Sequence, residues 1–185
     1  MTQRDPAVRA AGPDDAEQVA ALHADSWRRH YRGAYADAYL DGDVQADRRA
    51  IWSSRLAAPA DSVTVVAEDE QGLAGFVHVM LDEDAEWGSL VDNLHVAHDR
   101  RRSGIGAILL AHAGRGVLER AAHPSAYLWV LEQNAAAQRF YQACGGIRRD
   151  KAPVPPPRGD ASNLNGSPFG LRIAWSDVSV LARLR

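Results

Sequence analysis

The sequence predicts an α/β fold, of the α+β type, in which helices flank a mixed sheet. Two strand-and-helix pairs follow one another in the second half of the chain: strand 89–96 before helix 104–120, and strand 125–131 before helix 135–144. Two β-branched segments joined by a short turn precede them and predict a hairpin. With 185 residues, 46% of them hydrophobic, the chain can bury one sizeable core, so residues 1–185 are predicted to form a single domain.

The first third of the chain is predicted to be mainly helical. A short strand begins at Val8, and the turn at 12–15 then starts a helix in which apolar residues recur at helical spacing from Ala16. This helix continues or breaks between Trp27 and Gly33. Segments 34–42 and 48–56 predict a second and a third helix ahead of the main sheet.

The strands of the sheet follow this helical region. Segments 61–67 and 73–80 form the predicted hairpin, and Gly75 suggests a bulge within it. The helix at 135–144 is closed by two glycines. Residues 151–168 are rich in proline, glycine and asparagine and are predicted to form a surface loop, whereas the apolar segment 169–175 predicts a final strand.

The most informative segment is 94–110, LHVAHDRRRSGIGAILL, where a strand enters a basic glycine turn and leaves as a helix. Arg101, Gly104 and Gly106 have the spacing R-x-x-G-x-G. Glycines let the backbone approach an anion closely, and the following helix offers unpaired N–H groups at its positive end. The segment therefore predicts a pyrophosphate site, to which Arg100, Arg101 and Arg102 add positive charge.

A second motif follows in the expected order, because Asn134, Ala137, Phe140 and Tyr141 form the pattern N-x-x-A-x-x-F-Y. Together the two motifs resemble the GNAT N-acetyltransferase family over residues 89–146, about a third of the chain. The chain departs from the family at His98, where proline is frequent, and at Gly145-Gly146, where Gly-Phe is frequent. Neither departure removes a predicted cofactor contact.

The resemblance implies a single-domain GNAT-like fold, with a mostly antiparallel sheet of about seven strands. It implies that the two central strands splay apart to admit the pantetheine of acetyl-CoA, which pairs with backbone groups of Leu94 and Val96 like an added strand. The residues expected to bind this co-substrate are Leu94, Val96, Arg101, Arg102, Ser103, Gly104, Ile105, Gly106 and Asn134. Asn134 can also cap the helix that begins at Ala135.

Acetyl transfer to an amine needs a base, a stabilised oxyanion and a proton for the departing thiolate. The resemblance makes Tyr141 the general acid, and a phenol suits this role because its ordinary pKa near ~10 keeps it protonated at neutral pH. Asp92 is the leading base, since alternation places it on one strand face with Leu94 and Val96. Simple packing of Tyr141 and backbone hydrogen bonding by Asp92 are the alternatives. Alternation points His95 to the opposite face as a packed or hydrogen-bonded residue.

Candidate contacts to the amine acceptor are Trp27, Tyr31 and Glu86, and Glu86 is also the reserve base. The segment HADSWRRHYRGAYADAYL resembles the first helices of a GNAT subset, which border the acceptor site. Trp27, Tyr31 and Tyr35 could equally pack a helix onto its sheet. Acidic residues would suit a cationic amine. The predicted function is acetyl-CoA-dependent transfer to a primary amine of a small molecule or peptide.

Two other function classes are alternatives to an acetyltransferase. A catalytically silent acyl-CoA-binding sensor or interaction domain would bind CoA without turnover. A Rossmann-type dinucleotide domain is disfavoured, because the glycine turn lies mid-chain without a suitable ribose-binding acid. The lone Cys144 is expected to be a buried inert thiol, so direct transfer through a ternary complex is favoured.

Composition and hydropathy indicate which partners and which location the protein is expected to have. A formal net charge of -3 gives no support for a nucleic-acid partner. The polar start MTQRDPAVRA lacks the apolar core of a secretory signal, and no apolar run is long enough to span a bilayer, so the expected location is cytoplasmic and no membrane partner is expected. No metal site is predicted. The resemblance makes a homodimer plausible.

Overall fold

The computed structural model describes residues 6–184, so the ends of the predicted domain, residues 1–5 and 185, lie outside the described residues. Its elements are β1 (Ala7–Ala10), α1 (Ala16–His30), α2 (Asp37–Asp41), α3 (Val44–Ala57), β2 (Ser62–Asp69), β3 (Gly72–Asp84), β4 (Gly88–Val96), α4 (Ile105–Arg120), β5 (Ala126–Leu131), α5 (Ala135–Ala143), β6 (Ile147–Pro153) and β7 (Phe169–Trp175), with short 3-10 helices between some of them. The three predicted N-terminal helices and both strand-and-helix pairs are confirmed.

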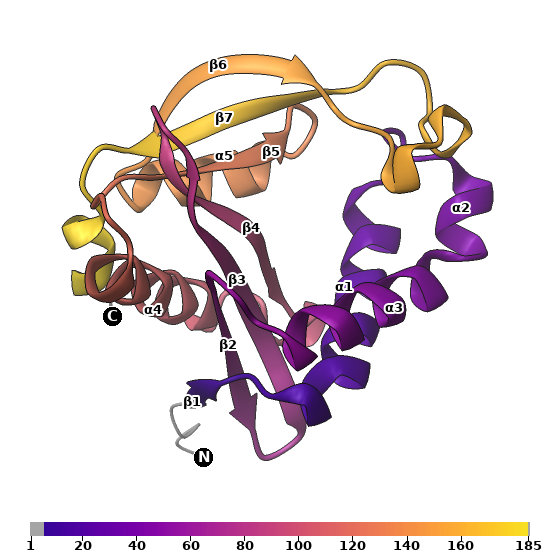
Figure 1. Ribbon diagram of the computed structural model, residues 1–185. Helices are drawn as coiled ribbons and strands as arrows, with labels where there is room; N and C mark the ends of the chain where they lie inside the picture. The colour runs from indigo at the N-terminus through magenta and orange to yellow at the C-terminus, as the bar shows by residue number, and fades with distance from the viewer. Residues whose placement is uncertain (1–5, 185) are drawn as a thin grey trace.

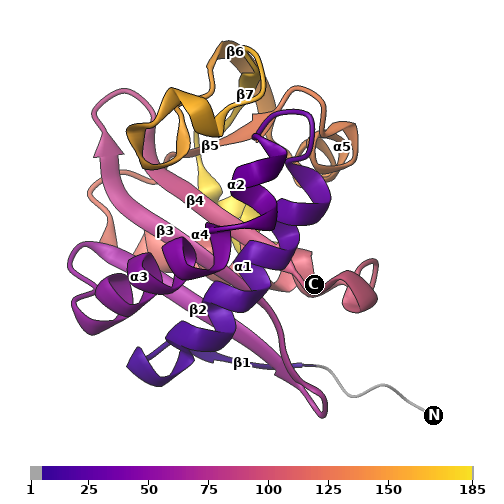
Figure 2. The same cartoon turned by 90° about the vertical axis from the view of Figure 1, so that its right-hand side faces the viewer.

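One seven-stranded sheet, in the order β1-β2-β3-β4-β5-β7-β6, organises the molecule (Figure 1). Its neighbouring strands are antiparallel except β4 and β5, which are parallel. Helix α4 covers one face, whereas α1, α2 and α3 lie on the other and stand in front of the sheet in Figure 2. The predicted mixed, mostly antiparallel sheet flanked by helices is therefore confirmed.

The two central strands separate soon after they meet. Strands β4 and β5 pair only at Ser89 with Ala126 and at Leu90 with Tyr127, close to the start of both strands. Beyond these two pairs the C-terminal halves of β4 and β5 have no ladder between them. The splay that the resemblance implied is present, and it leaves an opening in the middle of the sheet.

Apolar packing on both faces fixes the sheet between its helices. Leu109, Leu110 and Val117 of α4 are fully or almost fully buried against one face. On the other face Trp52 of α3 packs against Phe76, with ring centroids 5.0 Å apart. Burial of such side chains stabilises a fold by roughly 1.5–3 kcal/mol each. The helices on both faces are therefore firmly packed against the sheet that contains the opening.

Gly75 lies where two backbones approach closely. The register of β2 and β3 skips Ala74, which places a bulge beside Gly75 as predicted. A Cβ atom at Gly75 would lie 2.9 Å from the carbonyl oxygen of His95 and 2.9 Å from Leu109 Cδ1. A larger residue there would push β4 or α4 away.

Strand β6 corrects the prediction that residues 151–168 form a loop from their first residue. Lys151, Ala152 and Pro153 continue β6 and pair with β7 at the edge of the sheet. Proline is tolerated at the end of an edge strand, where no ladder hydrogen bond is lost. The strand is exposed along nearly its whole length and therefore lacks the alternation that reveals a half-buried strand.

Within residues 6–184, no helix combines the length and the apolar character that crossing a bilayer requires.

Candidate functional site

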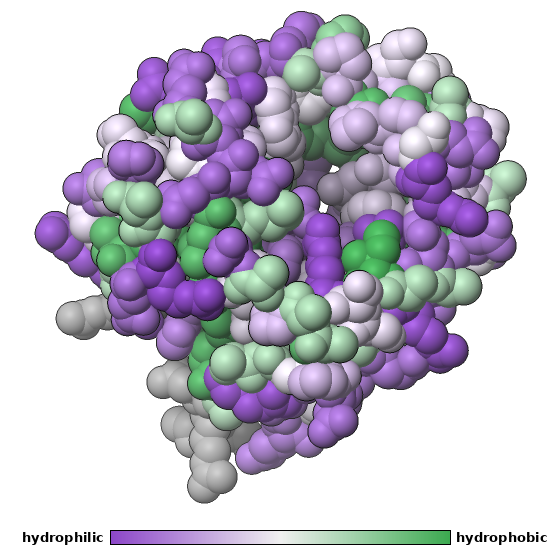
Figure 3. All heavy atoms as spheres, viewed as in Figure 1, coloured by the Kyte–Doolittle hydropathy of each residue, from purple (hydrophilic) through white to green (hydrophobic). Residues whose placement is uncertain are grey.

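The opening between β4 and β5 forms a cleft of about 510 Å³. Its walls come from the C-terminal halves of both strands, the turn at 100–106, helix α5 and the end of α1. A second cavity of about 420 Å³ adjoins it at Leu131, between the α1–α2 connection and the segment that leads into β7. Figure 3 shows a hollow on this face, below the connection between β6 and β7.

Strand β4 presents unpaired backbone groups to this cleft. The N–H of Ala97 donates to the carbonyl oxygen of Ala74 on β3, 2.8 Å away. In an antiparallel ladder alternate residues point their backbone groups to opposite sides, so Leu94 and Val96 direct theirs away from β3. Since β5 has already diverged, these N–H and C=O groups face the cleft, as the sequence predicts.

The basic turn ends at the N-terminus of α4. Arg102 and Gly104 both have left-handed backbone conformations, with φ of +65° and +86°, and Ser103 Oγ donates to the carbonyl oxygen of Arg100 at 2.5 Å. Side chains of Arg101 and Arg102 are exposed beside the cleft. The first N–H groups of α4 have no partner within the helix, so the turn combines free donors with positive charge.

Arg100 corrects one part of the prediction, because it is not free to meet a phosphate. Its Nε donates to Asp69 Oδ2 at 2.9 Å and its Nη2 donates to Gln71 Oε1 at 2.5 Å. The guanidinium thereby holds the pKa of the Asp69 carboxyl below its usual value. Arg100 ties the turn to the β2–β3 hairpin and leaves the exposed Arg101 and Arg102 as the charges that can meet a ligand.

Asn134 caps α5 and also lines the cleft. Its Oδ1 accepts the backbone N–H of Ala137 at 3.1 Å, which confirms the cap that the sequence suggested. Across the cleft, Gly106 of α4 lies so close to Phe140 of α5 that a Cβ atom on Gly106 would be 3.3 Å from the ring. The two helices therefore meet closely behind the opening.

Tyr141 lies on the wall of the cleft, with its ring against Phe140, and its hydroxyl has no hydrogen-bond partner among residues 6–184. Burial is the main cause that raises the pKa of Tyr141 above its ordinary value, and the nearby Tyr31 adds to it. The phenol is therefore protonated throughout the neutral range. Tyr31, which also lines the cleft, has a pKa raised to about 12, mainly by burial.

A bulge in β4 overturns the expected position of Asp92. His78 pairs with Asn93 and Val79 pairs with Val91, so Asp92 has no partner on β3. The extra residue reverses the alternation, and two neighbouring side chains then point to the same side of the sheet. Asp92 forms an ion pair with Arg55 of α3, 2.7 Å between Oδ2 and Nη1, whereas Leu94 and Val96 pack against the core beneath α4.

His95 therefore lies on the same side as Asp92, not opposite to it. Its Nδ1 is 2.8 Å from Ser26 Oγ of α1, and its ring is 4.6 Å from that of His23. Burial lowers the pKa of His95 to about 4, so the imidazole is neutral. The prediction of a hydrogen-bonded, packed histidine opposite to Leu94 and Val96 is confirmed, and only the predicted face of Asp92 was wrong.

Asn93 is a cleft residue that sequence reasoning missed. Its amide nitrogen donates to the carbonyl oxygen of Asp92, and its Oδ1 is buried without a hydrogen-bond partner among residues 6–184. A buried acceptor without a partner costs roughly 1–3 kcal/mol, which a donor entering the cleft would recover. Regular alternation would place the side chains of Asp92 and Asn93 on opposite faces of the strand. Only the bulge, which the sequence did not reveal, places both beside the cleft.

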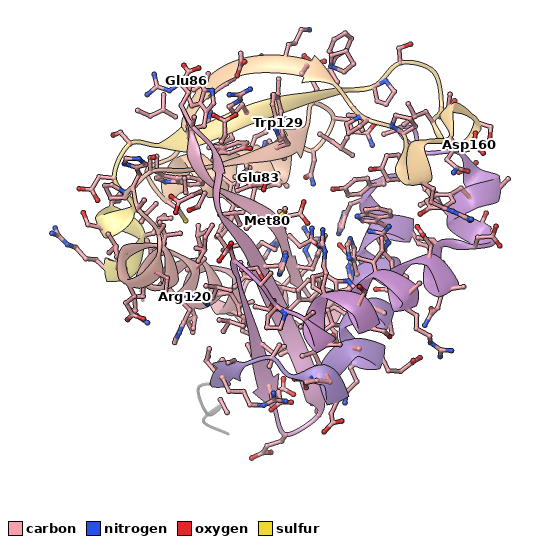
Figure 4. All side chains as sticks on the ribbon, in the orientation of Figure 1. Met80, Glu83, Glu86, Arg120, Trp129 and Asp160 are labelled. Atoms are coloured by element: carbon pink, nitrogen blue, oxygen red, sulfur yellow. The ribbon has the colours of Figure 1, made fainter. Side chains whose placement is uncertain are left out.

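Two of the predicted acceptor contacts lie away from the cleft. The Trp27 ring is buried among Tyr31, Tyr35 and Tyr39, and the Arg48 guanidinium stacks 4.2 Å from it. Packing is thus the role that its contacts support. Glu86 is exposed in the β3–β4 turn, at the outer tip of the hairpin in Figure 4, and does not line the cleft.

The comparisons with known proteins agree with this geometry. Residues 19–146 match the model of the Acetyltransferase (GNAT) family, and the chain belongs to this family. An uncharacterized N-acetyltransferase of Bacillus subtilis, YuaI, is 29% identical over 181 residues, 96% of each chain. A probable N-acetyltransferase of Mycobacterium tuberculosis is 30% identical over 151 residues, 73% of this chain and 76% of its own.

Solved structures share the fold at lower identity. The PaiA N-acetyltransferase of Thermoplasma acidophilum, solved with coenzyme A, has a TM-score of 0.71 at 19% identity, covering 93% of this chain and 100% of its own. YncA of Salmonella typhimurium, solved with its cofactor acetyl-CoA, has a TM-score of 0.67 at 15% identity, covering 95% of both chains. Family membership confirms the predicted acyltransferase class and its co-substrate, acetyl-CoA.

Proposed function

We propose that the cleft between β4 and β5 is the active site, in which acetyl-CoA gives its acetyl group directly to a primary amine. The observation that carries this proposal is the open edge of β4 beside the basic glycine turn. Backbone groups of Leu94 and Val96 can pair with the amides of pantetheine, as an added strand would. The adjoining cavity at Leu131 is lined by no residue of β4 or α4 and therefore offers neither the open edge nor the helix N-terminus.

The turn would hold the pyrophosphate. Unpaired N–H groups of Ile105 and Gly106 at the start of α4 favour an anion, and Arg101 and Arg102 supply charge-assisted hydrogen bonds. The left-handed conformation of Gly104 brings this backbone close to the ligand without a side chain in the way. Asn134 can contribute its amide nitrogen to pantetheine while its oxygen caps α5.

Transfer then proceeds by attack of a neutral amine on the thioester carbonyl. A C–N bond forms, the C–S bond breaks, and the proton that the thiolate needs comes from the Tyr141 hydroxyl. Attack makes the amine nitrogen positively charged, and its extra proton leaves to Asp92, either directly or through water; Asp92 then releases this proton to solvent and the Tyr141 phenolate takes one up, which restores both groups. Backbone N–H groups of β4 that face the cleft are placed to stabilise the oxyanion.

Direct transfer is supported by the state of Cys144. The thiol is buried at the end of α5, and burial raises its pKa above the ordinary value. A thiol that remains protonated is a poor nucleophile, and an acetylated enzyme intermediate at this residue is therefore disfavoured. We also propose that residues 1–185 act as one domain in the cytoplasm; a homodimer stays a prediction from the family.

Calorimetric titration with acetyl-CoA tests the site through a matched pair of variants. Gly104→Val introduces a β-branched residue at φ +86°, and Gly159→Val introduces the same strain at φ +70° in a distant turn, where a Cβ atom meets nothing within 4 Å. Gly104→Val is expected to weaken acetyl-CoA binding at least tenfold, whereas Gly159→Val leaves it unchanged. Equal affinity in the two variants would exclude the turn as the pyrophosphate site.

A further inference from the structure

We infer that the amine acceptor is a small molecule with one positive charge and an apolar or aromatic body, not a polycation, and that the Arg55–Asp92 pair sets this preference. The inference rests on the proposed function, because it concerns the acceptor side of the same cleft. It also narrows the expectation that acidic residues suit a cationic amine to amines with a single positive charge.

The charges that line the cleft are arranged unevenly. Three arginines, residues 100–102, lie at the turn, and Asp92 is the one carboxylate among the described residues that line the cleft. Its charge is offset by Arg55 at 2.7 Å, and the two side chains are only 31% and 28% exposed. A polycation needs several carboxylates to balance its charge, and the wall near Asp92 offers a pair with no net charge.

The titratable neighbours of Asp92 do not add negative charge. His78 and His95 have pKa values lowered to about 4, mainly by burial, so both rings are neutral. His30, which also lines the cleft, has a pKa lowered by burial and by Arg101. With acetyl-CoA bound, the phosphates occupy Arg101 and Arg102, Arg100 is already paired with Asp69, and the acceptor meets a nearly neutral surface.

Aromatic and apolar side chains form the rest of that surface. Tyr31, Trp129 and Leu131 line the cleft, and Trp129 keeps 37% of its surface exposed (Figure 4). One face of Trp129 is already covered by the Arg172 guanidinium, which lies 4.7 Å from its ring and 4.5 Å from that of Trp87. Arg172 is paired with Asp150 at 3.1 Å, so this wall offers no unpaired carboxylate to a second positive charge, whereas a flat apolar group can pack on the exposed part of Trp129.

The acidic hairpin turn does not alter this balance. Glu83 and Glu86 are exposed beyond the cleft and do not line it, and Asp84 accepts the backbone N–H groups of Glu86 and Trp87. The amine itself can be held without a net charge, since the buried Oδ1 of Asn93 is an acceptor that has no partner among residues 6–184. One N–H donor satisfies it.

Competition between acceptors tests the inference. Purified protein with acetyl-CoA is offered phenethylamine, tyramine, spermidine and kanamycin, and the acetylated products are quantified by mass spectrometry. We expect kcat/KM for the aromatic monoamines to exceed that for spermidine at least tenfold. Arg55→Gln leaves Asp92 unpaired and is expected to shift this ratio at least tenfold toward spermidine, whereas Arg55→Lys keeps the ratio.

Arg49→Gln provides the matched control on the same helix, because Arg49 pairs with Glu17 on the surface and does not line the cleft. Its ratio should equal that of the unaltered protein. If Arg55→Gln does not fold, Asp92→Asn removes the other partner; because Asp92 is the proposed base, binding of phenethylamine and spermidine to this variant is compared by calorimetry, and the ratio of affinities should move further toward the monoamine.

Three results would overturn the inference: spermidine or kanamycin as the better acceptor, an unchanged ratio in Arg55→Gln, or acetylation of none of the monoamines. Failure of the proposed function looks different. In that case acetyl-CoA does not bind to the protein in calorimetry, and no amine of either kind is acetylated.

Discussion

Replacing Tyr141 by phenylalanine removes one oxygen atom from the centre of the proposed site. The hydroxyl has no hydrogen-bond partner among residues 6–184, and the ring keeps its contacts with Phe140 and Trp175. Tyr141→Phe should therefore preserve the fold, because no buried partner is left unsatisfied. Stability of the variant should lie within about 0.5 kcal/mol of the unaltered protein.

The catalytic effect should be far larger than the effect on stability. A positioned general acid contributes about 10²–10⁴ to a rate. At roughly 1.36 kcal/mol for each factor of ten, loss of the proton donor raises the barrier by about 3–5 kcal/mol. The pantetheine contacts run through the backbone of Leu94 and Val96, so the affinity for acetyl-CoA should stay within about twofold, well below the ~1.4 kcal/mol of a tenfold change.

The assay measures three quantities on one preparation: kcat from release of the CoA thiol with an acceptor amine, Kd for acetyl-CoA from calorimetry, and Tm. Tyr127→Phe on β5 is the control, since Tyr127 is a buried tyrosine that does not line the cleft. We expect kcat to fall only in Tyr141→Phe. Turnover of Tyr141→Phe equal to that of Tyr127→Phe would refute the assignment of the general acid.

Three further predictions concern the elements that hold the site. Asn134→Ala should lower the free energy of unfolding by about 1 kcal/mol, because the cap is lost, and should also weaken acetyl-CoA binding. Asn134→Ser keeps a capping oxygen, so denaturant titrations should show restored stability while acetyl-CoA binding stays weak. Equal acetyl-CoA affinity of the unaltered protein and both variants would contradict a cofactor contact. Gly75→Ala should destabilise by about 1–3 kcal/mol, because its Cβ would lie 2.9 Å from a backbone carbonyl, and an unchanged denaturation midpoint would contradict this. Arg9 lowers the pKa of Asp15, so this pair stabilises the fold at neutral pH and the contribution is lost as the pH falls below about 4. Arg9→Ala should flatten the loss of stability measured by thermal melts between neutral and acidic pH, and an identical pH profile would exclude the pair as its cause.

Much of the fold could be predicted because local signals and packing agree. The glycine turn before α4 and the asparagine before α5 each mark a helix start, and apolar strands precede both helices. The predicted order of strands and helices is therefore the observed order, apart from β6. Strand β6 escaped prediction because it is an edge strand with both faces exposed, so burial leaves no pattern in its sequence.

The cofactor side of the site was easier to predict than the acceptor side. Backbone groups and glycines bind the pyrophosphate in the proposal, and the motif R-x-x-G-x-G fixes them within one short segment. Arg100 shows where this reasoning stops, because its partner Asp69 lies 31 residues earlier in the sequence. Only the tertiary structure shows that Arg100 is bound to Asp69, whereas Arg101 and Arg102 are exposed.

The acceptor side depends on a single extra residue in β4. Period-two alternation assigned Asp92 to the face of Leu94 and Val96, and the bulge moved it to the face of His95. Its partner Arg55 comes from a helix 37 residues away. Neither the bulge nor the ion pair has a signature in the sequence, so the surroundings of Asp92 could be described only from the structure.

The central claim is that the opening between β4 and β5 binds acetyl-CoA and passes its acetyl group to an amine. The most direct measurement is calorimetric titration of the unaltered protein with acetyl-CoA, followed by mass spectrometry of the same sample after addition of the amine mixture. The account predicts binding that Gly104→Val weakens, together with acetylated amine in the mixture. Acetyl-CoA binding that is insensitive to Gly104→Val, or the absence of any acetylated amine, would contradict it.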